Sequence, residues 1–260
     1  MDVRLLAARQ LDDYDRRCPG GVFAEPGVCL SIEQSYELQF EVARLRELRG
    51  ERVAGYKIGC ISRTMQDQLG IDRPVFGHVW ESELCASGSV LSTANFDGLA
   101  IEGEFAVRLA TDVPSVDWLR HHPAVFAAAF VVIELHNYVF RGNPAERAAE
   151  LIANNAIHAG VVMPVEETPL WHADALLGGV LRVLRGSELL GEAAGHQFEG
   201  GPLSGIVRLI EHLTQNGHQL RRGQLVLTGS PLPLWRVSSG DRIEVQCNEF
   251  GKAAMAYIDV

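Results

Sequence analysis

The pattern of the chain changes at Gly50, and this change constrains the fold more than any other feature. Before it, in "SIEQSYELQFEVARLRELRG", apolar residues such as Leu38 and Val42 recur every three or four positions, which predicts an amphipathic helix. Ser31 and Gln34 have the spacing of a capping box that begins such a helix, and Gly50 is a typical end. After Gly50, short apolar runs alternate with Gly, Pro and Asp, which indicates strands.

The region after residue 50 also contains two sequences typical of helices. Residues 143–160 form the first, with Asn143 as the expected cap and Pro144 in the first turn. Residues 203–217 form the second, with Ser204 as the expected cap in front of an apolar stripe. Helices are therefore expected between the strands, but not in a regular alternation with them.

Most of the remaining segments predict strands. Residues 178–195 predict a hairpin that turns near Arg185 and Gly186, and three further strands are expected in "GQLVLTGS", "DRIEVQCN" and "AAMAYIDV". Helices followed by many strands favour an α+β fold with a mixed or antiparallel sheet. We therefore expect an N-terminal helical region (1–52) packed on a β-rich domain (53–260).

Composition and charge exclude some classes of protein. The 260 residues are 47% apolar and 22% charged, as in ordinary globular proteins, and the net charge of −10 without a basic block argues against a nucleic-acid surface. The longest apolar run, "PAVFAAAFVVI", has about 11 residues and is too short to span a bilayer. No signal peptide is evident. The five cysteines are odd in number and scattered, so we expect free thiols in a reducing cytoplasm.

Two carboxylates lie two residues apart in "IEGEFAV". On a strand, Glu102 and Glu104 would point to the same side, about 6.6 Å apart along the chain. Their charges repel each other and the burial of either alone is costly, and a divalent cation would remove both problems. The alternative is a strand with one solvated face, and Gly103 between the two acids is unusual within a strand.

A third acid, Glu134, interrupts the most apolar stretch of the chain. A carboxylate there must be paired, neutral or bound to a metal. Three carboxylates without a Cys or His cluster favour Mg²⁺, with Mn²⁺ or Ca²⁺ next. His136 is two residues further on and would favour Mn²⁺ if it shared the same face; its alternative is a hydrogen-bonded strand histidine.

Lys57 is a single cation in the strand-like segment "VAGYKIGC". Gly55 and Gly59 flank it and would let the backbone approach a ligand closely. Near three carboxylates, this lysine would balance charge, bind a substrate carboxylate or take part in proton transfer. The alternative is a surface lysine on an edge strand.

Four segments together carry a resemblance to a known family. In order, "GYKIGCISRTMQDQLGIDRPVFGHVW", "IEGEFAVRL", "VVIELHNYVFRG" and "LVLTGSPLPLWRVSSGDRIEV" resemble the hydratase/decarboxylase branch of the fumarylacetoacetate hydrolase superfamily, over about residues 5–258. This branch includes 2-keto-4-pentenoate hydratases and 4-oxalocrotonate decarboxylases. The resemblance implies a mixed β-sheet roll of the kind found in the C-terminal domain of fumarylacetoacetate hydrolase.

The resemblance also implies a site. Mg²⁺ or Mn²⁺ would be held by an E-x-E pair and one further acid, which match Glu102, Glu104 and Glu134, and the family lysine matches Lys57. The substrate would be a 2-oxo acid or its enol, whose carboxylate and 2-oxygen chelate the metal. Ser230 matches a family position near the substrate carboxylate, although a serine before proline is also typical of a turn. Two further candidates for substrate binding are Gln39 and Arg63.

The chain departs from the family pattern at three places. Val75 stands where the branch has an acid in P-D-[YF]-G, and "HNYVFRG" replaces a D-S-R segment. In "NNAIHAG", Ile157 and His158 occupy positions where small hydroxyl residues are usual. His158 either supplies the missing proton shuttle, and is then catalytic with Lys57, or only reshapes the pocket.

The sequence thus predicts a cytoplasmic, metal-dependent lyase for small 2-oxo or 2-hydroxydienoic acids in aromatic catabolism, with residues 53–260 as the catalytic domain. The first candidate is a 2-keto-4-pentenoate hydratase reaction. The alternatives are a 4-oxalocrotonate-type decarboxylase, a metal-dependent C–C hydrolase and a catalytically dead partner subunit. The resemblance implies a homo-oligomer, or a complex with a related hydratase or decarboxylase.

Overall fold

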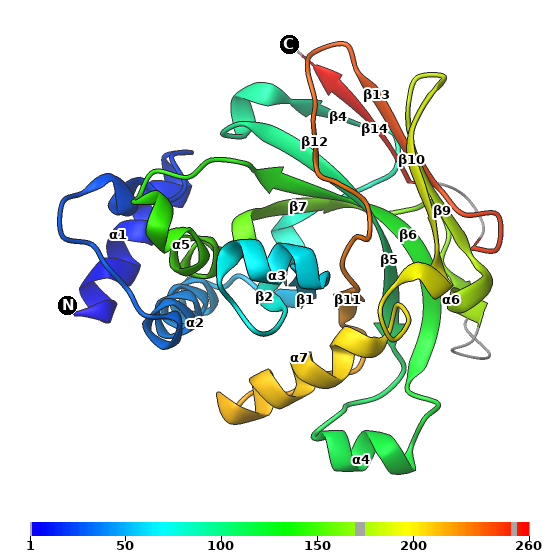
Figure 1. Ribbon diagram of the computed structural model, residues 1–260, viewed down its shortest axis with the longest axis horizontal. Coiled ribbons are helices and arrows are strands. Elements are labelled where there is room, and N and C mark those ends of the chain that lie inside the picture. Colours follow the sequence, from blue (N-terminus) through cyan, green and yellow to red (C-terminus); the bar gives the residue numbers. More distant parts are fainter. Residues whose placement is uncertain (1, 170–174, 251–253, 260) are drawn as a thin grey trace.

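The protein is described by a computed structural model that covers residues 2–169, 175–250 and 254–259. Helices α1, α2 and α5 lie together beside the sheets (Figure 1). The α-helices of the described residues are α1 (Val3–Asp15), α2 (Ile32–Leu48), α3 (Arg63–Leu69), α4 (Val116–His121), α5 (Arg147–Ala153), α6 (Ala175–Gly178) and α7 (Ser204–Gln215). Short 3-10 turns lie at Gly21–Ala24, Glu81–Glu83, Thr93–Asn95, Pro144–Glu146, Asn155–Ile157 and Gly195–Gln197. The predicted α+β class is confirmed.

Helix α2 is the helix predicted before Gly50. Its capping box is present, because the Gln34 amide donates to Ser31 Oγ at 3.2 Å and the Ser31 amide donates to Gln34 Oε1 at 3.0 Å. Leu38 and Val42 pack in one apolar cluster with residues of α1 and α5. The N-terminal helices therefore pack on the later part of the chain through α5. The predicted division into a helical region (1–52) and a β-rich domain (53–260) stays a prediction.

The helix predicted over 143–160 is shorter in the structure. Helix α5 ends at Ala153, because Asn155–Ile157 have φ angles of 53°, 51° and 55°, which a right-handed helix cannot contain. His158 then begins a strand. The expected helix end was wrong because this left-handed turn contains no glycine that would mark it in the sequence.

The caps of two helices also differ from the prediction. Asn143 Oδ1 accepts a hydrogen bond from the Ala145 amide at 3.1 Å, so it caps the 3-10 turn in front of α5 instead of α5 itself. Ser204 is the first residue of α7, and its hydroxyl donates to the Glu199 carbonyl at 2.9 Å. The residue at the N-cap position of α7 is Leu203.

The strands of the described residues form two sheets. The larger has the order β2-β1-β11-β5-β6-β7-β3, with β12 on β5 and β8 on β6, and it is mixed because β1 with β11 and β3 with β7 are parallel. Its strands are β1 (Val53–Gly59), β2 (Val75–Trp80), β3 (Leu84–Cys85), β5 (Leu99–Leu109), β6 (Phe126–Asn137), β7 (His158–Val162), β8 (Thr168–Pro169), β11 (Leu225–Leu227) and β12 (Trp235–Arg236). The strand predicted in "GQLVLTGS" is thus confirmed as β11.

The smaller sheet has the order β10-β9-β13-β14-β4. Its strands are β4 (Ser89–Ser92), β9 (Val180–Arg185), β10 (Glu188–Ala194), β13 (Arg242–Gln246) and β14 (Ala254–Asp259), which confirm the hairpin and the last two predicted strands. The sheet packs on the outer face of β5 and β6, where the main apolar core lies. Among the described residues no helix is apolar and long enough for a membrane span, and all five cysteines carry free thiols.

The close approach of the smaller sheet explains Gly103 in β5. A Cβ atom at Gly103 would lie 2.5 Å from Val183 Cγ2 and 3.2 Å from Val245 Cγ2, so only glycine fits between the two acids. We expect Gly103→Ala to lower the free energy of unfolding by about 1–3 kcal/mol in urea denaturation. Gly178→Ala is the control, because no described atom lies within 4 Å of its Cβ position, and it should change stability by about 0.5 kcal/mol or less. Equal effects would contradict this packing.

The larger sheet curls so that β2 comes beside β7. Asn155, just before β7, donates from Nδ2 to the His78 carbonyl at 2.9 Å and accepts from the His78 amide at 2.7 Å. The inner face of the curled sheet carries an apolar cluster that includes Phe130 and Val132 of β6. Because side chains alternate along a strand, Glu134 and His136 continue this inner face. The inner face of the larger sheet is therefore apolar at one end and charged at the other.

Three histidines surround Phe40 where α2, β2 and the end of α7 meet. The ring centroid of His78 lies 5.3 Å from that of Phe40, and the rings of His212 and His218 stack on Phe40 at 5.5 and 5.0 Å. Burial, with positive charge nearby as a second cause, lowers the pKa of His78 to about 3 and the pKa of His212 to about 4. Both rings are neutral in the folded protein at neutral pH.

These histidines make folding sensitive to acid. In the unfolded chain both histidines take up a proton near pH 6.5, whereas in the folded chain they stay neutral down to about pH 4 for His212 and about pH 3 for His78. The free energy of unfolding therefore falls as the pH drops below 6.5 toward these values. Each histidine contributes a slope of up to about 1.4 kcal/mol per pH unit. In urea unfolding, His212→Gln should show a smaller slope than the wild type, and the exposed control His121→Gln should keep the wild-type slope. Equal slopes for His212→Gln and the wild type would refute the assignment.

Candidate metal centre and active site

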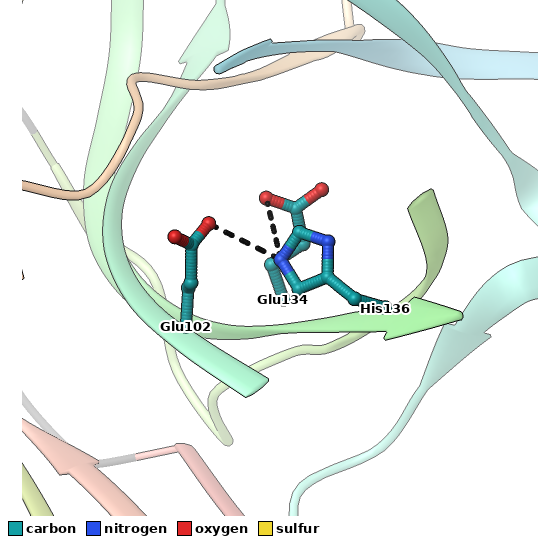
Figure 2. A group of neighbouring side chains, drawn as sticks. All are labelled: Glu102, Glu134 and His136. Atoms are coloured by element: carbon teal, nitrogen blue, oxygen red, sulfur yellow. Dashed lines mark ion pairs between the residues drawn. The ribbon is translucent and has the colours of Figure 1, made fainter. Parts of the chain in front are cut away.

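Two acids and a histidine lie side by side on the inner face of β5 and β6. Glu102 and Glu134 are direct neighbours across the two strands, and His136 is the next residue on the same face (Figure 2). His136 Nε2 lies 3.2 Å from Glu102 Oε2 and 3.6 Å from Glu134 Oε2. One ligand atom from each residue lies within 4.8 Å of the others, which makes this a group that could hold a metal ion.

Glu104 is the third predicted carboxylate and lies on the same face of β5. It is fully buried, and its Oε2 accepts a hydrogen bond from the Gly229 amide at 2.8 Å. Burial, followed by the charges of Glu134 and Glu102, raises the pKa of Glu104 well above its ordinary value. The structure therefore brings the three predicted carboxylates together and adds His136 to them. The role of the glutamates as ligands stays a prediction.

Lys57 is buried against this group. Its Nζ lies 3.2 Å from Glu134 Oε1, and the lysine side chain is only 3% exposed. Burial alone would lower the pKa of Lys57, but the charges of Glu134, Glu102 and Glu104 outweigh it and raise the pKa. The alternative of a surface lysine on an edge strand is wrong, because β1 lies between β2 and β11.

Glu134 is the centre of the electrostatic network. Burial favours its neutral form, but Lys57, His136 and His158 hold its pKa well below the ordinary value. His158 Nδ1 lies 2.7 Å from Glu134 Oε1. Glu134 therefore carries its charge although it is completely buried. Its ion pair with Lys57 and its contact with His158 offset the loss of water around the carboxylate.

His158 also faces a second polar region. Its Nε2 lies 3.6 Å from Glu83 Oε2, and Glu83 Oε1 accepts a hydrogen bond from Arg46 Nη1 at 2.8 Å. These residues line a cavity of about 180 Å³ between α1, α2, β2 and β7, together with Tyr14, Gln39, His78 and Asn155. Glu83 and Arg46 were not predicted as site residues, because each belongs to an ordinary polar segment that only the fold brings to His158.

The three predicted substrate-binding residues have other partners in the structure. Gln39 Nε2 donates to the carbonyls of Phe76 at 2.9 Å and Ile152 at 2.7 Å. The Ser230 hydroxyl donates to the Gly103 carbonyl at 3.0 Å and accepts from the Leu232 amide, as in a turn. Arg63 is exposed and pairs with Asp67 at 2.9 Å. Gln39 lines the cavity beside His158, and the binding roles of all three stay predictions.

The chemistry of the buried atoms fits a divalent cation. The buried side-chain atoms without a described hydrogen-bond partner include four in this group: Glu104 Oε1, Glu134 Oε2 and both ring nitrogens of His136. Lys57 supplies one full positive charge to three carboxyl groups. Buried polar atoms of this kind are rare unless a water or an ion satisfies them, and a set of oxygens with one imidazole suits Mg²⁺ or Mn²⁺.

Comparisons with known proteins bear on the family resemblance and on the fold. No protein-family model matches the chain. The chain is 27% identical over 234 residues to 2-hydroxyhexa-2,4-dienoate hydratase of Comamonas testosteroni, a match that covers 88% of each chain. It is 25% identical over 237 residues to 4-oxalocrotonate decarboxylase of Pseudomonas putida, covering 88% of this chain and 86% of that one.

The fold has a solved counterpart. 4-Oxalocrotonate decarboxylase from Pseudomonas putida G7, solved in complex with magnesium and adipate, superposes with a TM-score of 0.86. The match covers 98% of this chain and 97% of that one at 21% identity, so it shows the shared fold. The sequence matches confirm the resemblance to the hydratase/decarboxylase branch: the chain is similar to named hydratases and decarboxylases, and it shares the fold of a solved decarboxylase.

Proposed function

We propose that the protein is a metal-dependent lyase for small 2-oxo or 2-hydroxydienoic acids, with a 2-keto-4-pentenoate hydratase reaction as the first candidate. The observation that carries this proposal is the buried Lys57, 3.2 Å from Glu134 in a group of three carboxyl groups. A hydratase and a decarboxylase among the relatives support the reaction class.

The metal in this proposal is Mg²⁺ or Mn²⁺. Glu102, Glu104 and Glu134 would hold it, and His136 offers a nitrogen beside two of them. When bound, the ion would act as a Lewis acid that stabilises negative charge on the 2-oxygen of the substrate. The magnesium bound in the structurally similar decarboxylase supports the choice of ion, and the imidazole of His136 favours Mn²⁺.

The residues of the chain supply proton transfer and orientation. The neighbouring carboxylates raise the pKa of Lys57 and so keep a proton on its Nζ, which makes it the candidate donor of that proton to a substrate carbon. Hydration of 2-hydroxypenta-2,4-dienoate needs one such proton and one hydroxyl from water, added across the distal double bond. His158 holds Glu134 through Nδ1 and keeps the carboxylate from turning away.

Decarboxylation of a 2-oxo diacid is the second candidate. It is favoured by the decarboxylase relative and by the fold match to that enzyme class. Both reactions need the same stabilised charge on the 2-oxygen and differ in whether the substrate gains water or loses CO₂. The proposed compartment is the cytoplasm, because free thiols fit a reducing environment. The proposed assembly is a homo-oligomer.

An ultraviolet assay tests the proposal. The substrates are 2-hydroxypenta-2,4-dienoate and 2-oxohex-3-enedioate, each with chelator, with Mg²⁺ and with Mn²⁺. Loss of dienol absorbance that requires metal supports the hydratase, and metal-dependent CO₂ release from the diacid selects the decarboxylase. Turnover that survives complete chelation, or no turnover of either compound, would contradict the proposed function.

A further inference from the structure

Two buried apolar side chains, Val75 and Ile157, belong to one apolar cluster, in which Val75 lies near Lys57 and Ile157 directly precedes His158. Building on the proposed function, we propose that they determine specificity: they form an apolar wall for the distal end of the substrate and select a monocarboxylate with an uncharged tail over a dicarboxylate. The wall is defined here as Val75 and Ile157 with the partly buried Cys60, Phe140 and Leu234, which all belong to one apolar cluster.

The backbone conformation at Ile157 is unfavourable for a β-branched residue. Its φ of 55° lies in the left-handed region, which a β-branched residue rarely enters. Asn155 holds the turn through its two hydrogen bonds to the backbone of His78. Strained conformations of this kind persist where the surroundings require them, and they concentrate at functional sites. Here the turn places an apolar side chain directly before His158, which contacts Glu134.

Val75 and the Lys57 ammonium both lie close to Gly59. A Cβ atom built on Gly59 would be 3.2 Å from Lys57 Nζ and 3.3 Å from Val75 Cγ2. Gly59 and Val75 are direct neighbours across β1 and β2, so the valine methyl group and the ammonium flank one position on the inner face. A substrate whose reacting carbon reaches Lys57 would therefore touch Val75.

The charges near the wall leave a second carboxylate without a partner. The lysine and the two histidines of the site, Lys57, His136 and His158, all face Glu134, with Lys57 Nζ 3.2 Å and His158 Nδ1 2.7 Å from its carboxylate. On the wall side the arginines are exposed: Arg63 and Arg73 pair with Asp67 and Asp72, and Arg147 lies 5.0 Å from the ring of Phe140 at the surface. A distal carboxylate against the wall would lose its water without gaining a counter-charge, whereas an alkyl tail would be buried favourably.

A matched ligand pair tests this inference independently of turnover. We would measure the affinity of the Mn²⁺-loaded protein for 2-oxopentanoate and 2-oxopentanedioate, which differ only in a terminal methyl or carboxylate, by calorimetry. The wild type should bind the monoacid about 100-fold more tightly than the diacid. Ile157→Asn relieves the strained backbone and makes the wall polar, and it should reduce this ratio to about 10-fold or less. Val75→Thr should act in the same direction.

Two controls separate specificity from general damage. Pyruvate has no tail, so its affinity should be the same in the wild type and both variants. Val90→Thr, at an exposed position of the smaller sheet, should keep the wild-type ratio. Equal affinity of the wild type for the two acids, binding of neither, or a ratio that Ile157→Asn leaves unchanged would overturn the inference. Failure of the proposed lyase reaction would instead appear in the dienol assay.

Discussion

Replacing Lys57 with methionine should lower kcat for 2-hydroxypenta-2,4-dienoate about 1000-fold while Mn²⁺ stays bound. Methionine fills a similar volume but cannot hold a proton, and proton transfer by a positioned side chain contributes about 10²–10⁴-fold to a rate. Loss of the ammonium 3.2 Å from Glu134 removes a cation that competes with the metal. The Mn²⁺ affinity should therefore be unchanged or tighter.

The measurement is stopped-flow absorbance at saturating Mn²⁺, with Mn²⁺ affinity measured in parallel by electron paramagnetic resonance. The control is Arg44→Met, which removes an exposed cation that pairs with Glu41 and should leave kcat unchanged. If Lys57→Met kept more than about a tenth of the wild-type kcat, Lys57 would not be the proton donor. If it lost Mn²⁺ as well, the lysine would support the site structurally instead.

Replacing Glu104 with glutamine should reduce Mn²⁺ affinity at least about 100-fold and leave the stability of the metal-free protein unchanged. Burial and the charges of Glu134 and Glu102 raise the pKa of Glu104, which favours its protonated form in the metal-free protein, and glutamine has the shape and charge of that form. A neutral amide is a much weaker ligand than a carboxylate for a hard cation. Activity should fall with the affinity.

Calorimetry with Mn²⁺ measures the metal affinity, and urea unfolding in the presence of a chelator measures the stability of the metal-free protein. Glu199→Gln serves as the control, because that glutamate is exposed on the loop before α7 and should affect neither quantity. A Glu104→Gln variant with wild-type Mn²⁺ affinity would remove Glu104 from the ligand set and leave Glu102, Glu134 and His136 as the candidate centre.

Local signals in the sequence predicted the elements that hold the site. The capping box at Ser31 and Gln34 marks the start of α2, and the alternation of side chains along a strand put Glu102 and Glu104 on one face. The burial of Glu134 followed from its apolar surroundings alone. In each case the signal lies within a few residues of the feature it predicts, so neighbouring side chains carry the information.

Features that depend on contacts between distant segments were not predictable in the same way. The left-handed turn at Asn155–Ile157 contains no glycine and depends on hydrogen bonds to β2. Glu83 reaches His158 only because the larger sheet curls. His136 had two open interpretations from the sequence, and the pairing of β5 with β6 brings its Nε2 beside both Glu102 and Glu134.

The most direct test of this account is a crystal structure of the Mn²⁺-soaked protein, with anomalous diffraction at the manganese edge. One strong anomalous peak is expected between β5 and β6, within bonding distance of the carboxylates of Glu102, Glu104 and Glu134. The same map would show whether His136 is a fourth ligand. An absence of any peak among these glutamates, in crystals of protein that turns over its substrate, would contradict the central claim that they hold the catalytic metal.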